Sequence, residues 1–142
     1  MPVKKKAPDA QFLNVDLDVY SRSDLQPLVN GFGKKVMALY VGRERRRYSA
    51  HLELARYPKK TSADATIRAF CTLIRALPKA ERGMWNAAKT REFSVGVQAG
   101  QQPFACDFRI EAQTVKAVAE LGAVIVLTVY GPERAKRRNV SK

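Results

Sequence analysis

Apolar and polar side chains alternate along residues 12–20, which is the pattern of a β-strand with one buried face. The side chains predicted to share that buried face are Leu13, Val15, Leu17 and Val19. Further strands are predicted at residues 36–41, 48–55, 93–98 and 104–110. Residues 124–130 form the last strand. Because this strand is almost entirely apolar, we expect it to be covered on both faces or to lie in the middle of the sheet.

Apolar residues at helical spacing predict helices between these strands. The clearest apolar stripe consists of Ile67, Phe70, Cys71, Ile74 and Leu77. Its helix is expected to begin at a capping box of Thr61 and Asp64 and to end before Pro78. Shorter helices are predicted at residues 23–33, with Ser23 as the N-cap and Gly33 at the end, at residues 80–88, and at residues 111–122.

The order of the predicted elements is β-α-β-β-α(α)-β-β-α-β. This order favours an α+β fold, a two-layer sandwich in which helices pack on one face of a mostly antiparallel sheet. The connection at residues 42–47 is short enough to make its two strands antiparallel neighbours. We expect a single domain at residues 11–131, between flexible basic tails at residues 1–10 and 132–142.

Composition narrows the class of protein. The 142 residues include 26 Lys or Arg against 13 Asp or Glu, a formal net charge of +13, and 46% of them are hydrophobic. These values are typical of one globular domain. The longest apolar run, residues 121–130, is about half the roughly 20 residues that a membrane-spanning helix needs. We expect a cytoplasmic protein without a membrane partner.

The densest basic cluster lies between two predicted strands, at the expected tip of a hairpin. Its members are Arg43, Arg45, Arg46 and Arg47. Because guanidinium groups bind phosphates and carboxylates, this cluster could contact nucleic acid or an acidic protein surface. The alternative is that these charges keep the edge of the hairpin from pairing with other chains.

A second candidate site lies on the polar face of the predicted sheet. If the first and third strands are neighbours, this face brings together Asp16, Asp18, His51 and Glu53. Two carboxylates and an imidazole could bind a divalent cation or exchange protons. The alternative is a solvated face whose acidic groups pair with Arg109 and other basic side chains.

The sequence contains none of the common motifs of catalytic or cofactor-binding sites. The chain contains no glycine-rich phosphate loop, paired-histidine motif or nucleophile elbow. The two cysteines, Cys71 and Cys106, both fall on predicted apolar faces, so we expect small core residues and not nucleophiles. We therefore expect neither catalytic residues nor a cofactor.

Three segments carry a resemblance to a known family: Arg-Glu-Phe-Ser-Val-Gly-Val-Gln at residues 91–98, Phe-Arg-Ile-Glu-Ala-Gln-Thr-Val-Lys-Ala-Val-Ala-Glu-Leu-Gly at 108–122, and Val-Leu-Thr-Val-Tyr at 126–130. The chain resembles the uncharacterised bacterial domain of unknown function 4279-like family over about residues 12–131. It departs from that family in its basic hairpin and tails, and it lacks a tryptophan expected near Leu52. The resemblance implies no established activity.

Together these features favour a protein that works by binding. The first interpretation is a non-catalytic protein-interaction module of the immunity-like kind, whose contact surface is the hairpin and the polar face of the sheet. The alternative is a nucleic-acid-binding protein that uses the basic tails and the hairpin arginines. The sequence leaves the partner and the oligomeric state open.

Overall fold

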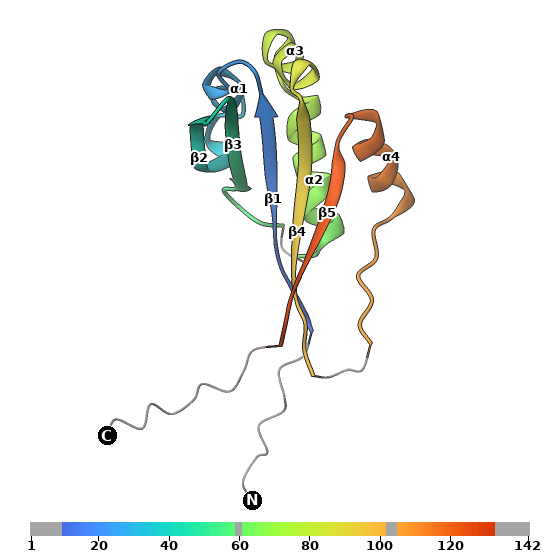
Figure 1. Ribbon diagram of the computed structural model, residues 1–142. Helices are drawn as coiled ribbons and strands as arrows, with labels where there is room; N and C mark the ends of the chain where they lie inside the picture. Colours follow the sequence, from blue (N-terminus) through green and yellow to red (C-terminus); the bar gives the residue numbers. More distant parts are fainter. Residues whose placement is uncertain (1–9, 59–60, 102–104, 133–142) are drawn as a thin grey trace, which may run out of the picture.

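The structure is a computed structural model that describes residues 10–58, 61–101 and 105–132. Five strands form one sheet in the order β2-β3-β1-β4-β5 (Figure 1). Their bounds are Gln11–Ser21 for β1, Val36–Glu44 for β2, Arg47–Leu54 for β3, Thr90–Gln98 for β4 and Val124–Tyr130 for β5. All neighbouring strands are antiparallel except β4 and β5, which are parallel.

Helices pack against one face of this sheet (Figure 1). They are α1 at Gln26–Gly31, α2 at Ala63–Arg75, α3 at Lys79–Ala87 and α4 at Ala112–Glu120. A short 3₁₀ turn, Gly33–Lys35, leads from α1 into β2. The arrangement confirms the predicted α+β sandwich. Within the described residues, no helix is long and apolar enough to cross a membrane.

The core forms where the alternation of β1 meets the apolar stripe of α2. The β1 residues Val15, Leu17 and Val19 have no exposed surface, and the predicted helix residues Ile67 and Phe70 have none either. Each large side chain that is fully removed from water contributes about 1.5–3 kcal/mol. Both periodicities were therefore predicted correctly where they build the centre of the molecule.

Two helix starts differ from the prediction by a few residues. Ser62, not Thr61, caps α2, because its hydroxyl accepts the amide of Ala65 at 3.0 Å. The first helix begins at Gln26, whose amide donates to the Asp24 carboxylate at 3.0 Å, so Ser23 is not its N-cap. Gly33 follows α1 at a φ of +64°, as a helix-ending glycine should.

The predicted strand at residues 104–110 is wrong. Residues 105–110 have no strand pairing and lead as a connection into α4, and Phe104 lies outside the described residues. The place beside β4 is taken by β5, which reaches a parallel position through the α4 crossover. Cys106 is consequently exposed, against expectation, whereas Cys71 is buried as predicted.

Strand β5 also departs from the prediction. It lies at the edge of the sheet, and Leu127 and Val129 are 65% and 64% exposed. Helix α4 contacts β5, and Ile125, near the beginning of β5, packs against the core. An apolar run alone does not distinguish a central strand from an exposed edge strand, so the predicted burial on both faces is wrong for the described chain.

Leu13 is 42% exposed and does not share the buried face of Val15. The register of β1 against β4 shifts between Phe12 and Asn14, so Phe12 pairs with Val97. Such a β-bulge adds one residue to one strand and reverses the alternation beyond it. The bulge turns Phe12, and not Leu13, toward the helices.

Candidate binding surface on the open face of the sheet

The face of the sheet opposite the helices carries the polar side chains of β1, β3 and β4. We call it the open face, because no helix among the described elements covers it (Figure 1). Register places Asp18 opposite His51 on β3 and Asp16 opposite Ser94 on β4. Glu53 lies two residues from His51 on the same side of β3. The four residues predicted to gather on this face are therefore together.

Asp18 is at the centre of the open face and uses both carboxylate oxygens. Its Oδ1 lies 2.7 Å from Nδ1 of His51, and its Oδ2 accepts the Ser94 hydroxyl at 2.7 Å. An ionised carboxylate has no proton to give, so the imidazole donates through Nδ1–H. Asp18 thus fixes the orientation of the His51 ring.

This cluster is not arranged as a nucleophilic triad. A serine nucleophile needs its hydroxyl hydrogen-bonded to the base. Here the hydroxyl of Ser94 donates to Asp18, and the carboxylate lies between the serine and His51. The arrangement holds the three side chains rigidly and does not activate the hydroxyl group.

Asp16 and Glu53 add negative charge next to Asp18, and we call these three residues the acidic row. Burial, reinforced by the charges of Asp18 and Glu53, raises the pKa of Asp16 above its usual 3.8. Tyr57 donates its hydroxyl to Glu53, and burial together with this carboxylate raises the pKa of the phenol. The acidic row is therefore a patch of crowded carboxylates.

The side chains of the acidic row are not grouped like the ligands of a metal site within the described residues. Among the described residues, no group of three or more His, Cys, Asp and Glu side chains is arranged to hold a metal ion. The expected pairing with Arg109 is also wrong, because Arg109 borders a hollow on the helix side of the sheet with Val95 and Val97. Residues 105–110 were predicted to be a strand, and their actual course explains this error.

The hairpin tip is cationic, but it does not gather all four predicted arginines. Glu44 pairs with Arg47, so the turn itself consists of Arg45 and Arg46. Arg43 pairs with Tyr48 and stacks on that ring at 5.8 Å, on the helix side of the sheet. We call the remaining three residues the arginine tip; they are Arg45, Arg46 and Arg47.

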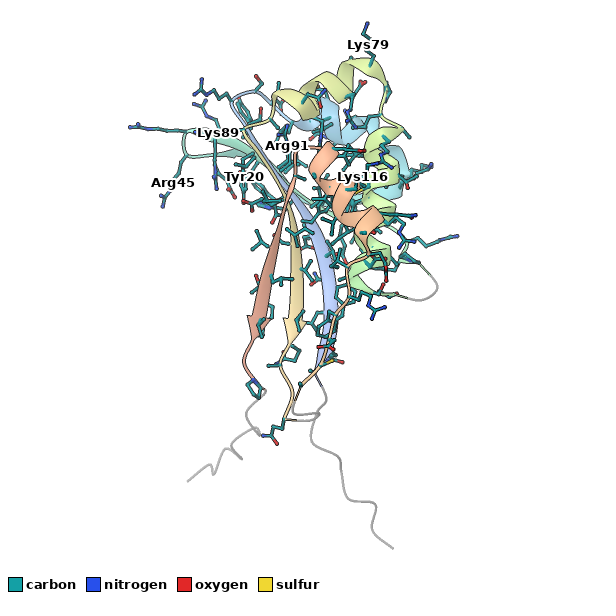
Figure 2. The ribbon with its side chains drawn as sticks, turned by 90° about the vertical axis from the view of Figure 1, so that its right-hand side faces the viewer. Tyr20, Arg45, Lys79, Lys89, Arg91 and Lys116 are labelled. Carbon is teal, nitrogen blue, oxygen red and sulfur yellow. The ribbon has the colours of Figure 1, made fainter. Side chains whose placement is uncertain are left out.

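Lys89 joins the arginine tip from another part of the chain. Its backbone amide donates to the Tyr20 carbonyl at 2.8 Å, and it borders the same hollow as Arg45. Figure 2 shows Arg45 projecting from the hairpin, away from the helices. Among the described residues, no member of the arginine tip forms an ion pair. Sequence reasoning missed Lys89 because it lies far from the hairpin along the chain.

Aromatic rings connect the arginine tip to the acidic row. The guanidinium group of Arg47 lies 3.7 Å from the ring centre of Tyr20, a cation–π contact. The rings of Tyr20 and Tyr40 lie 5.8 and 6.0 Å from the His51 ring. Tyr40 reaches the open face because a bulge shifts the register of β2 between Ala38 and Tyr40. This bulge has no signal in the alternation pattern.

Comparisons of the chain with protein-family models, with curated proteins and with solved structures found no match. The resemblance to the domain of unknown function 4279-like family therefore stays a prediction. Function has to be inferred from the chemistry of the open face.

Proposed function

We propose that the protein is a non-catalytic protein-interaction module of the immunity-like kind, and that the arginine tip and the open face form its contact surface. The observation that supports this proposal is a juxtaposition of unlike charges. The arginine tip adjoins the acidic row through the contacts of Arg47 with Tyr20, of Tyr20 with His51 and of His51 with Asp18. A surface of this kind complements a partner that carries both signs of charge.

The acidic row argues for a protein partner over a polyanion. Proteins that bind single-stranded nucleic acid across a sheet use a positively charged face on which bases stack. Here the centre of the face carries Asp16, Asp18 and Glu53, which would repel a phosphate chain lying across β1 and β3.

The composition of this surface also resembles a protein interface. Aromatic residues, Met and Arg are enriched in such interfaces. Tyr40 and Met37 are exposed on β2 beside the open face, at 39% and 52%. Together with the arginine tip, they provide the apolar anchors and the planar cations that carry binding energy in protein complexes.

The experiment is affinity capture from a lysate of cells that express the protein, compared across matched charge variants. Arg45→Glu/Arg46→Glu removes the cationic part, and Asp16→Lys/Glu53→Lys reverses the acidic part. Lys34→Glu/Lys35→Glu is the control, because these exposed lysines lie in the turn after α1. We expect each of the first two variants to lose at least nine-tenths of a captured protein that the control retains. Equal capture by all the variants, or no capture by the wild type, would contradict the proposal.

Nucleic-acid binding is the second candidate, and the absence of ion pairs at the arginine tip among the described residues favours it. If the tip contacts phosphates, affinity for a short DNA duplex should fall steeply between about 50 and 200 mM salt. Arg45→Glu/Arg46→Glu should flatten that dependence. Fluorescence anisotropy measures both, and a wild type that shows no binding at low salt eliminates this candidate.

A further inference from the structure

Within the part of the chain that the structure describes, the outer edge of β5 carries backbone groups without hydrogen-bond partners. The Tyr130 carbonyl accepts the Ala99 amide at 2.8 Å, so Tyr130 directs its backbone groups toward β4. Because consecutive residues of a strand direct these groups to opposite sides, Ile125, Leu127 and Val129 direct theirs to the free edge. Among the described residues, none of these three amides and three carbonyls has a hydrogen-bond partner on that edge.

The β5 edge also lacks the features that normally prevent strand edges from pairing. Proteins protect such edges with charges, proline or bulges. The sequence of β5, Val-Ile-Val-Leu-Thr-Val-Tyr, contains no charged residue and no proline, and its register against β4 is unbroken. Each of the other four strands carries at least one charged residue. The β5 edge is thus the uncharged edge of a strongly basic chain.

We propose that β5 pairs with β5 of a second copy of this chain, in antiparallel orientation about a two-fold axis at Leu127. In that register Leu127 faces its own copy, Ile125 faces Val129, Val126 faces Thr128 and Val124 faces Tyr130. The free groups of Ile125, Leu127 and Val129 then meet as hydrogen-bonded pairs, which is the alternation that an antiparallel ladder requires. Every pair of side chains is apolar or Val with Thr, and the Val–Tyr pairs are among the favourable cross-strand combinations.

Charge and burial favour a second copy as the occupant. Two chains of charge +13 repel each other over most of their surface, but β5 is neutral and the arginine tip lies at the opposite edge of the sheet. The terminal sequences at residues 1–9 and 133–142 are rich in Lys and Arg, so their composition does not match the apolar side chains that β5 presents. In the pair, β5 lies in the middle of a continuous sheet, the position of which its apolar sequence is typical. The open faces of both copies stay accessible, so this inference does not depend on the proposed function.

Oligomeric state tests the pairing directly. By size-exclusion chromatography with light scattering, the wild type at tens of micromolar should have twice the mass of the 15.9 kDa chain. Leu127→Lys places two cations opposite each other and should weaken the dimer at least tenfold. Met37→Lys is the matched control, because Met37 is similarly exposed, at 52%, on the opposite edge strand. A monomeric wild type would overturn the proposal, as would a Leu127→Lys dimer as strong as the wild type.

The register is tested by disulfide trapping in a Cys106→Ser background, because Cys106 is exposed. Leu127→Cys places two thiols across the two-fold axis and should give a covalent dimer under mild oxidation. Val124→Cys is the control, because its two copies would lie about 20 Å apart along an antiparallel pair. Trapping at both positions, or at neither, would overturn this register. Circular dichroism should show that all variants stay folded, because both side chains are more than half exposed.

Discussion

Strand β2 ends the sheet on one side with a bulge and with Arg43 and Glu44, whereas β5 ends it on the other side with seven uncharged residues in unbroken register. The two strands are also connected differently. A two-residue turn joins β2 to β3, whereas β5 reaches β4 only through the α4 crossover. The β2 edge is therefore formed by a local hairpin and carries charged residues. The β5 edge depends on contacts between residues distant in the sequence, and it carries no charge. This difference agrees with the two proposals, in which the β2–β3 hairpin carries part of the contact surface and β5 pairs with a second chain.

The largest expected effect comes from the contacts that position the crossover. Trp85 has no exposed surface, and its indole N–H donates to the Leu121 carbonyl at 2.9 Å, where α4 ends. Trp85→Ala should cost about 3–5 kcal/mol of stability and should loosen α4 and β5 before β2. Urea denaturation and amide exchange measure these two effects. Trp85→Phe, which keeps most of the volume, should cost less, and equal loosening at both edges would contradict the comparison.

A smaller loss of stability is expected at the start of α4. Asp64 accepts the Glu111 amide at 2.9 Å and forms an ion pair with Arg68. Burial alone would raise the pKa of Asp64, but hydrogen bonds from Thr114 and Glu111 and the charge of Arg68 together lower it below 3.8. Asp64→Asn should cost about 1.5–3 kcal/mol at neutral pH.

The contribution of Asp64 to the free energy of unfolding should depend on pH. Because the folded-state pKa of Asp64 is lowered, the stability it provides is complete above pH 3.8 and is lost as the pH falls through the folded-state value. The difference between the wild type and Asp64→Asn should therefore disappear in acid. A difference that stays constant from pH 6 down to about pH 2 would show that the carboxylate charge is not responsible.

On the β2 side, a single exposed contact is expected to contribute less. The guanidinium of Arg47 lies over the Tyr20 ring, whereas Arg46 has no such contact with any aromatic ring in the described part of the chain. Arg47→Ala should cost about 0.5–1 kcal/mol, the range for an exposed cation–π pair, and Arg46→Ala should cost less. Thermal denaturation of the two variants measures the difference. Equal losses would mean that the stacking contributes nothing.

The smallest effect should be a gain. Since burial and the neighbouring carboxylates raise the pKa of Asp16, its ionised form is less favourable in the folded chain than in the unfolded chain. Asp16→Asn should raise the Tm slightly, on the order of 1–2 °C at neutral pH. The gain should vanish below pH 3.8, where the unfolded carboxyl is protonated too. Asp107→Asn is the exposed control and should leave the Tm unchanged; a lower Tm for Asp16→Asn would refute the crowding of the acidic row.

The centre of the fold could be predicted from the sequence because its periodicities follow directly from burial. The alternation around Leu17 and the helical stripe at Ile67 and Phe70 both point to the same core. The position of β5 could not be predicted, because an apolar run looks the same in a central strand and in an exposed edge strand. Residues 105–110 alternate like a strand, but the place beside β4 is occupied by β5.

The candidate site could also be predicted only in part from the sequence. Alternation places Asp18 and His51 on the same face once β1 and β3 are neighbours. The role of Ser94 requires the pairing of β1 with β4, and the position of Tyr40 requires a bulge. Both depend on tertiary pairing, which local residue patterns do not determine.

The most direct test of the account is amide hydrogen exchange at the β5 edge, followed by NMR at several protein concentrations. If β5 pairs with a second copy, the amides of Ile125, Leu127 and Val129 should be protected in concentrated samples. They should lose that protection on dilution or in Leu127→Lys, while the β2 edge stays unchanged. Rapid exchange of these three amides at every concentration would contradict the difference between the two edges.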